Sequence, residues 1–297
     1  LGGIGFMWIM RHWQWKHIDS NGLIIILENF AYLFKTQQNF RNMVHQIAKK
    51  AFVITLAALV LYGCGKKKEK NEVIIHELSD TDMLNPTNYQ SADAGYYIAQ
   101  MFQGLWGINP KTLEYEPILA KALPIEEYDS ASGLLKYTCE IRDEAVWDNG
   151  TPITAKDIDF SIKLYKAPVI NNEQNRPYFE LITGVITYPE NPRKLTIVCN
   201  KKYILAKNVC GSFSVIPQYI YDPKHLMDNF SIKDINEKFN EIAENPTMKE
   251  FAVEYNSEKF QRDSGYIVGS GPYAFDQWVT GQKIVLKKKK NWLKKIY

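Results

Sequence analysis

Residues 147–160 read WDNGTPITAKDIDF, and their order predicts a tight turn followed at once by a helix. Residues 148–150 (Asp-Asn-Gly) form the turn, because Asn and Gly accept a positive φ at little steric cost and Asp can bond to the backbone that follows it. Thr154 and Asp157 have the spacing of a capping box, in which the acidic side chain also favours the positive end of the helix. We therefore expect a strand-turn-helix corner whose role is structural rather than chemical.

The corner connects a strand to a helix. Residues 135–142 alternate apolar and polar side chains without a break, which is typical of a strand with one buried face. The members of that face are Leu135, Tyr137, Cys139 and Ile141. The apolar side of the helix comprises Ile158, Ser161, Ile162 and Tyr165. The helix should end at Ala167, because Pro168 disfavours helical geometry in the residue before it.

Further strands and helices are expected on both sides of the corner. Residues 72–78 (EVIIHEL) suggest a short apolar strand, and residues 194–199 a second, β-branched strand. Ser91 should cap a helix in which apolar residues recur at helical spacing. These residues are Ile98, Met101, Phe102 and Leu105. The predicted fold class is mixed α/β, a mixed sheet with helices.

The composition fits a packed domain and gives no support to a nucleic-acid partner. Of 297 residues, 45% are hydrophobic and 13% aromatic, which is ample for a core. The net charge is +3, but residues 1–63 hold six Lys or Arg against two Asp or Glu. Residues 64–297 hold thirty Lys or Arg against thirty-one Asp or Glu. Binding to phosphates requires a concentrated basic face, and the balance of charges does not indicate one.

Residues 43–63 resemble a bacterial lipoprotein signal peptide. Lys49 and Lys50 precede an apolar core at residues 51–61, and residues 61–64 (LYGC) resemble a lipobox, although Tyr62 departs from the usual small or aliphatic residue. The apolar core would be only about 16 Å long as a helix, too short for a bilayer core of roughly 30 Å. We expect Cys64 to be lipidated, with residues 64–71 as a polar tether to the folded domain.

Residues 1–42 precede a plausible start methionine at Met43. We interpret them as non-native upstream translation and exclude them from the fold. Their mixture of aromatic and basic residues leaves an interfacial helix as the alternative.

The remaining cysteines and histidines predict no metal site. Cys139 and Cys199 lie in strand-like runs, where a free thiol behaves as a small hydrophobic side chain. A bridge between Cys199 and Cys210 is an alternative in an oxidising compartment. No pair has metal-ligand spacing, and we expect neither a metal nor another cofactor.

Five stretches, in this order, resemble the peptide-type solute-binding proteins of ABC importers, the group with oligopeptide-, dipeptide- and nickel-binding members. They are LSDTDMLNP at 78–86, QGLWG at 103–107 with PILAKALP at 117–124, WDNGTPITAKDIDFSIKLY at 147–165, SVIPQYIYDP at 214–223 and GSGPYAFDQWVTGQKIVL at 269–286. The resemblance runs over residues 73–286. It is carried most clearly by the Asp-Gly-Thr-Pro-Thr-Ala-Asp pattern of the corner.

The resemblance implies a two-lobed architecture like that of type II periplasmic binding proteins. Such a protein closes on a solute by hinge motion, because the ligand makes contacts only in the closed state. It would then deliver a peptide or similar small solute to an ABC permease and ATPase complex, without breaking a bond. We expect a monomer held by its lipid on the periplasmic or cell-surface side of the bacterial membrane.

The resemblance also suggests ligand-binding candidates. The loop after the first strand lines the cleft in relatives, which suggests Asp80, Thr81, Asp82 and Met83, although a solvated turn is the alternative. Gln103 and Trp106 come next, and Trp106 could instead cover the core.

The end of the chain departs from the family pattern. Relatives continue well beyond the stretch at residues 269–286 to build a second lobe, whereas this chain ends in KKKKNWLKKIY at 287–297. We interpret residues 287–297 as an aberrant end and residues 72–286 as the first lobe alone, with the second lobe missing.

Other functions compete with solute capture. A secreted hydrolase is disfavoured, because neither G-x-S-x-G nor H-E-x-x-H occurs in the sequence. A non-transport surface lipoprotein, acting as a sensor or scaffold, and a non-functional fragment remain the alternatives.

Overall fold

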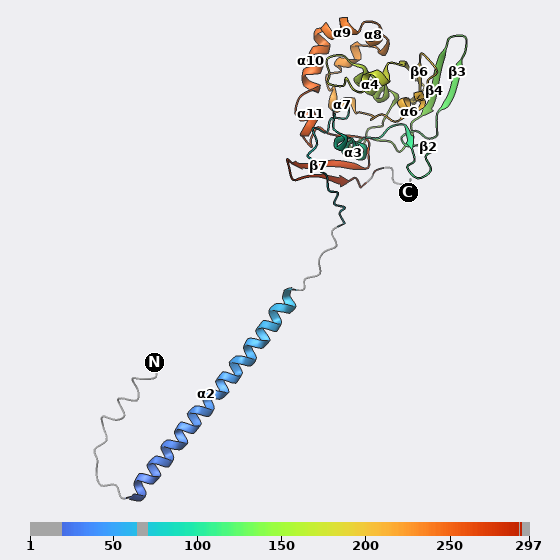
Figure 1. Cartoon of the computed structure of the whole chain (residues 1–297). Helices are drawn as coiled ribbons and strands as arrows, with labels where there is room; N and C mark the ends of the chain where they lie inside the picture. Colours follow the sequence, from blue (N-terminus) through green and yellow to red (C-terminus); the bar gives the residue numbers. More distant parts are fainter. Residues whose placement is uncertain (1–19, 64–70, 291, 293–297) are drawn as a thin grey trace. The chain divides into compact units, whose positions relative to one another are not determined.

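The computed structural model describes residues 20–63, 71–290 and 292 (Figure 1). The chain divides into two units, Leu1–Ile74 and Ile75–Tyr297. The described part of the first unit is dominated by one helix, α2 (Ser20–Gly63). In the described part of the chain, no helix combines the length and the apolar character that a membrane crossing requires. Cys64 and the tether up to residue 70 lie outside the described residues.

The second unit combines eight strands with shorter helices in its described residues. The strands are β1 (Trp106–Ile108), β2 (Tyr115–Pro117), β3 (Ile125–Asp129), β4 (Leu134–Glu140), β5 (Ile182–Tyr188), β6 (Asn191–Cys199), β7 (Tyr273–Val279) and β8 (Lys283–Lys288). The helices are α3 (Ala92–Met101), α4 (Ala155–Lys166), α5 (Arg176–Phe179), α6 (Ala206–Gly211), α7 (Gln218–Tyr221), the 3-10 helix η1 (Leu226–Asn229), α8 (Ile232–Glu237), α9 (Phe239–Glu244), α10 (Pro246–Tyr255) and α11 (Lys259–Arg262). The mixed α/β class is confirmed.

The largest sheet has four antiparallel strands in the order β3-β4-β6-β5. Two hairpins, β1-β2 and β7-β8, stand apart from it. Leu135 lies opposite Cys199 in the register of β4 and β6. The alternation predicted for residues 135–142 is confirmed, because its four apolar members are all buried. The strand predicted at residues 194–199 forms the second half of β6.

Helix α4 contributes side chains to two hydrophobic clusters. Ile158, Ile162 and Tyr165 pack in the cluster that covers the sheet. Phe160 and Leu164 belong to the second cluster, with residues of α3, α8 and α10. The sequence predicted the first face correctly but not the second, so α4 is a central helix rather than one with a single buried side.

The corner at residues 147–160 forms as predicted. The Asp157 carboxylate accepts the Thr154 N–H at 2.8 Å, and α4 ends with Ala167 as its C-cap. Gly150 has a φ of 83°, which supplies the positive φ of the turn. The turn side chain that bonds to the following backbone is Asn149, whose Oδ1 accepts from Thr151, and not Asp148.

Two expected elements differ in the structure. No strand forms at residues 72–78, and its apolar side chains are exposed, Leu78 completely. A strand needs a neighbour for its backbone groups, and no described strand pairs with this segment. Helix α3 begins after its Ser91 cap as predicted but ends at Met101. Leu105 lies outside α3 but is fully buried, so it is apolar because it packs in the core and not because it belongs to the helix.

The last described residues pack against the rest of the second unit. The Lys289 ammonium lies 2.6 Å from Asp148 and donates to the Gly269 carbonyl at 2.6 Å. Strand β8 extends past Leu286 to Lys288. The boundary drawn at residue 287 stays a prediction, although Lys289 is hydrogen-bonded as an ordinary part of the fold.

Buried polar groups of α4 find partners inside the second unit. The Ser161 hydroxyl donates to the Asp157 carbonyl at 2.6 Å and accepts the Ile216 N–H at 2.8 Å. The Lys166 ammonium donates to the Phe179 carbonyl at 2.6 Å. Burial lowers the pKa of Lys166 from 10.5 to about 8, because the charged form loses water.

Lys166 should make stability depend on pH in the alkaline range. The unfolded chain holds this proton up to pH 10.5 and the folded chain only to about pH 8, so the Lys166 contribution stabilises the fold as pH rises through that window. We expect the free energy of unfolding of wild type, relative to Lys166→Met, to rise by about 2 kcal/mol between pH 7.5 and pH 10. Urea unfolding at both pH values measures it.

Lys156→Met is the matched control, because Lys156 is exposed on the same helix. It should leave the pH dependence unchanged. A constant difference between wild type and Lys166→Met at the two pH values would contradict the prediction.

Candidate functional site

An open hollow of about 390 Å³ lies on the second unit. Its walls are α3, the strand β1, Ile118 of the segment after β2, and α6 with the loop that follows it. The polar side chains of its lining are Tyr89, Gln103, Asn208, Ser212 and Ser214. The apolar side chains are Ile98, Ala99, Phe102, Trp106, Ile108, Ile118 and Phe213. A mixed lining of this size suits a small organic ligand.

Gln103 combines a fixed backbone with an available side chain. Its N–H donates to the Ser270 hydroxyl at 2.9 Å, and its carbonyl accepts the Val215 N–H at 3.0 Å. The residue is partly exposed, and its side-chain amide has no hydrogen-bond partner among the described residues. An amide carries both donors and an acceptor, so Gln103 can bind either kind of polar group on a ligand.

Trp106 supports the hollow from within the core. Its side chain is completely buried, and its Nε1 donates to the Lys207 carbonyl at 2.8 Å. Its only donor is therefore already used. The indole thus lies in the core at the floor of the hollow, and a ligand role for Trp106 stays a prediction.

Two glycines allow the walls of the hollow to meet. A Cβ at Gly211 would lie 2.0 Å from the Trp106 indole, and one at Gly104 would lie 2.1 Å from the Gly211 carbonyl oxygen. That carbonyl accepts the Leu105 N–H at 2.8 Å. A side chain has no room at either place, because the Gly211 carbonyl fills the space beside Gly104 and the Trp106 indole fills the space beside Gly211.

The loop at residues 80–83 does not line the hollow, and its carboxylates are hydrogen-bonded within the chain. Asp80 accepts from the Trp278 indole at 3.0 Å and from the Gly281 N–H at 2.7 Å. Asp80 thereby joins its loop to the β7-β8 hairpin. Met83 is partly exposed.

Asp82 and Thr81 bond to the start of α3. Asp82 accepts the Ser91 hydroxyl and the Gln90 N–H, each at 2.7 Å. Burial opposes its ionisation, but these hydrogen bonds outweigh burial and lower its pKa. Thr81 is almost buried, with its hydroxyl 3.0 Å from that of Ser91. A ligand role for residues 80–83 stays a prediction, and the contacts show a structural role.

Sequence reasoning missed several polar residues of the hollow. Tyr89 follows the 80–83 loop, and burial together with the charge of Asp82 raises its pKa. Asn208 and Ser212 come from α6 and its end, where their side chains are 3.0 Å apart. The stretch at residues 103–107 pointed to one wall, but no pattern in residues 206–214 indicated the facing wall.

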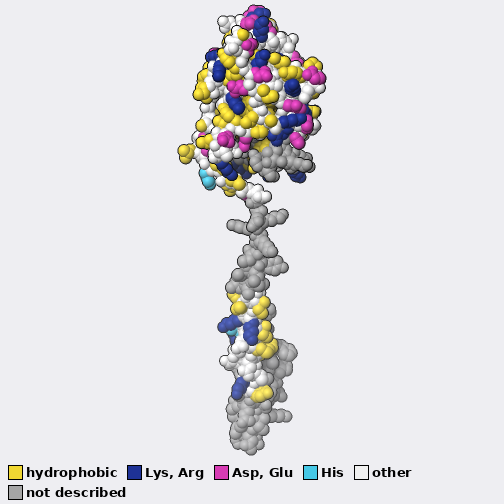
Figure 2. All heavy atoms as spheres, turned by 90° about the vertical axis from the view of Figure 1, so that its right-hand side faces the viewer, with side chains coloured by type: hydrophobic (Ala, Val, Ile, Leu, Met, Phe, Trp, Pro, Cys, Tyr) yellow, Lys and Arg dark blue, Asp and Glu magenta, His cyan; other side chains and the backbone are white. Residues whose placement is uncertain are grey.

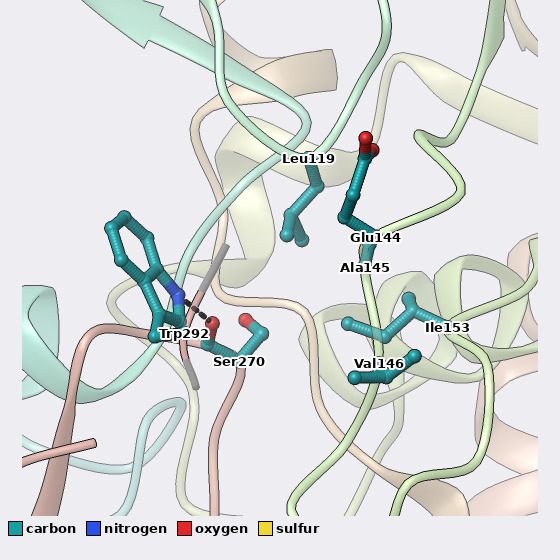
Figure 3. A pocket seen from close by; sticks show the side chains of 7 residues that line it. All are labelled: Leu119, Glu144, Ala145, Val146, Ile153, Ser270 and Trp292. Carbon is teal, nitrogen blue, oxygen red and sulfur yellow. Dashed lines mark hydrogen bonds between the residues drawn. The ribbon is translucent and has the colours of Figure 1, made fainter. Parts of the chain in front are cut away.

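A second recess is too small for a solute. It holds about 20 Å³, roughly the space of one water. Figure 3 shows Leu119, Ala145, Val146 and Ile153 around it, with the Trp292 indole donating to the Ser270 carbonyl at 2.8 Å. We interpret this recess as a gap in the packing of the last described residues.

Neither charge nor metal ligands define another site in the described residues. Figure 2 shows acidic and basic side chains interspersed over the visible face of the second unit. Within the described ranges, no group of three His, Cys, Asp or Glu side chains is placed to hold a metal ion.

The comparison with known families identifies the chain. Residues 114–297 match the model described as bacterial extracellular solute-binding proteins, family 5 Middle. The match covers more than half of the sequence, so the chain belongs to this family. Its members are extracellular solute-binding proteins rather than a class of enzymes.

Curated relatives and solved structures agree with this family. The chain is 23% identical over 228 residues to the oligopeptide-binding protein AppA of Bacillus subtilis, covering 76% of this chain and 35% of that protein. It is 33% identical over 118 residues to oligopeptide-binding protein OppA of the same organism, covering 39% of this chain and 20% of that one. The chain thus spans about a third or less of the length of these relatives.

Two solved structures share the fold. One is NikZ from Campylobacter jejuni in complex with Ni(L-His), with a TM-score of 0.51 and 24% identity, covering 72% of this chain and 34% of that one. The other is an oligopeptide-binding protein from Thermus thermophilus with a pentapeptide, with a TM-score of 0.52 and 22% identity, covering 71% and 35%. The second unit therefore has the fold of part of a periplasmic binding protein.

The close approach at Gly211 predicts a large effect of one methyl group. In Gly211→Ala the new Cβ would overlap the Trp106 indole, which is completely buried. We expect the free energy of unfolding to fall by about 2 kcal/mol or more, as for other overpacked cores. Urea unfolding followed by circular dichroism measures it.

Gly184→Ala is the control, because a Cβ there meets nothing within 4 Å. It should change the free energy of unfolding by less than about 0.5 kcal/mol. Equal stability of Gly211→Ala and Gly184→Ala would show that the two walls are not in contact as described.

Proposed function

We propose that this chain forms one wall of a solute-binding site that captures a peptide or a similar small solute for an ABC importer. The observation that carries the proposal is the hollow beside Gln103, with a volume of about 390 Å³ and mixed polar and apolar walls. Its size and lining suit a short peptide segment, whose backbone groups need donors and acceptors and whose side chains need apolar contact.

The relatives support the same class of ligand. Both curated relatives are named oligopeptide-binding proteins, and one solved relative holds a pentapeptide. A second solved relative holds Ni(L-His), so a metal chelate is the ligand that the test must distinguish. In our proposal no bond of the solute is broken.

Capture requires a second wall opposite the hollow. The hollow is open, and a ligand on it would keep one side in water. We propose that closure brings the opposing wall onto the bound solute and thereby shifts the population toward the closed state. One wall alone should bind weakly, because the facing polar groups contribute nothing.

The proposed partners follow from this role. They are an ABC permease and ATPase complex that accepts the solute, with the protein acting as a monomer. Location on the periplasmic or cell-surface side fits a family of extracellular proteins. We propose attachment to the membrane through lipid on Cys64, which lies outside the described residues, after removal of residues 43–63.

Gln103→Ala should weaken solute binding without loss of fold. Gln103 lines the hollow, and its hydrogen bonds to Ser270 and Val215 use the backbone, so loss of the side chain should leave them intact. With a pool of penta- to nonapeptides at millimolar concentration, we expect the melting temperature of the wild-type chain to rise by about 3 °C, and that of Gln103→Ala by less than half as much.

Gln282→Ala is the matched control, because Gln282 is exposed in the β7-β8 turn and does not line the hollow. It should keep the full response to peptides. If no peptide raises the melting temperature of the wild-type chain, the peptide proposal is contradicted. If nickel with histidine raises it and peptides do not, the ligand is a metal chelate instead.

Cys64→Ser should release the protein from membranes. The serine hydroxyl cannot form the thioether that carries lipid on a cysteine, and one remaining hydrophobic segment of the signal is too short to span the bilayer. Fractionation of expressing cells should show wild type in the membrane pellet and the variant in the soluble fraction. Recovery of Cys64→Ser in the membrane would argue against lipidation at this position.

A further inference from the structure

Two buried thiols touch beneath one wall of the hollow. Cys199 is the last residue of β6, and Cys210 is the fifth residue of α6. Their Sγ atoms are 3.4 Å apart, and both side chains are completely inaccessible to solvent. The two positions are eleven residues apart in the sequence. The fold thus brings the end of a strand and a helix into contact through two sulfur atoms.

The two sulfur atoms are in non-bonded contact. A disulfide has an S–S length of about 2.0 Å, so the two sulfurs need to approach by about 1.4 Å, which small rotations of the side chains can supply. Cys139 is also buried but contacts neither sulfur within hydrogen-bonding distance in the described structure. Cys199 and Cys210 are therefore the pair that the geometry selects.

We propose that Cys199 and Cys210 are oxidised to an intramolecular disulfide when this chain folds outside the cytoplasm. The chain belongs to a family of extracellular proteins, and disulfides form and persist in such oxidising environments. This proposal holds whether or not the hollow binds a peptide, because it depends only on the two thiols and their compartment.

The oxidant is a second disulfide, either on a thiol oxidase or in oxidised glutathione. One cysteine thiolate attacks that disulfide to form a mixed disulfide and release one thiolate. The other cysteine thiolate then attacks the mixed disulfide, forming the Cys199–Cys210 bond and releasing the second. Two electrons pass to the oxidant, which leaves as two thiols after taking up the two protons that the cysteines lost.

The reaction should take place during folding and not afterwards. Contact with Cys199, together with burial, raises the pKa of the Cys210 thiol in the folded chain. A thiol with a raised pKa is a poor nucleophile, and no oxidant reaches a fully buried sulfur. The bond must therefore form while residues 199–210 are still accessible, after which burial protects it from reductants.

The disulfide would hold one wall of the hollow to the central sheet. The loop that it closes contains most of α6, including Asn208, which lines the hollow. The bond would fix α6 to β6 at the position where Gly211 meets Trp106. Oxidation therefore stabilises the wall against local opening, and reduction loosens it.

Peptide mapping of the full chain tests the proposal directly. The denatured, reduced protein is refolded with reduced and oxidised glutathione, then alkylated with iodoacetamide in denaturant and digested with trypsin. Lys201, Lys202 and Lys207 separate the two cysteines, so residues 195–201 and 208–224 become distinct peptides. We expect these two peptides to be recovered joined by a disulfide in most of the sample.

The opposing outcomes are equally distinct. Recovery of both peptides in alkylated form, or joining of either one to the Cys139 peptide at residues 137–142, would overturn the proposal. A parallel refolding with reductant and no oxidised glutathione should yield only alkylated peptides, which calibrates the measurement.

A second measurement reports the effect on stability. Closing a loop of this length should raise the melting temperature of the oxidised chain by about 5 °C over that of the reduced chain. Cys139→Ala should retain this difference, whereas Cys199→Ala and Cys210→Ala should each abolish it. A difference that survives in the latter two variants would assign the redox effect to other cysteines and overturn the proposal.

Discussion

The fold depends on a helix that is buried on nearly every side. Helix α4 contributes to both hydrophobic clusters, so the sheet and the helices α8 and α10 are held together through it. Its polar groups must therefore find partners inside the protein, because each unpaired one would cost about 1–3 kcal/mol. Ser161 and Lys166 meet this requirement by bonding to the backbone of other segments. The position of α4 is thus fixed by polar contacts as well as by apolar packing.

The candidate site derives its shape from this core. Trp106 fills the floor from the cluster over the sheet, and the glycines at 104 and 211 let the two walls come within backbone contact. A rigid floor and closely joined walls pre-organise the hollow, so a ligand need not order them on binding. Gln103 is the exception in this neighbourhood, because its side chain has no partner among the described residues. Because its backbone is held by hydrogen bonds and its amide has no such partner, we propose Gln103 as a residue that contacts the solute.

The sequence predicted local structure well and the site only in part. The corner at residues 147–160 was predictable because turn and capping residues act on their immediate neighbours. The facing wall at residues 206–214 was not, because Asn208 reaches the hollow only through the packing of α6 on β1. Residues 72–78 have strand-like composition, but no strand in the described part of the chain pairs with them, and a strand depends on its neighbour. The hydrogen bonds of Asp80 to Trp278 and of Asp82 to Ser91 were not predictable, because spacing alone does not assign such partners.

The contact between Asp148 and Lys289 joins positions 141 residues apart in the chain. Gln103 and Ser270 are even more distant, as are Met101 and Gly271. During synthesis on the ribosome, Asp148 therefore lacks this partner until residue 289 has emerged. Contacts between such distant residues form late, so the nascent chain stays incompletely folded for longer. A polypeptide destined for translocation in an unfolded form would benefit from that delay.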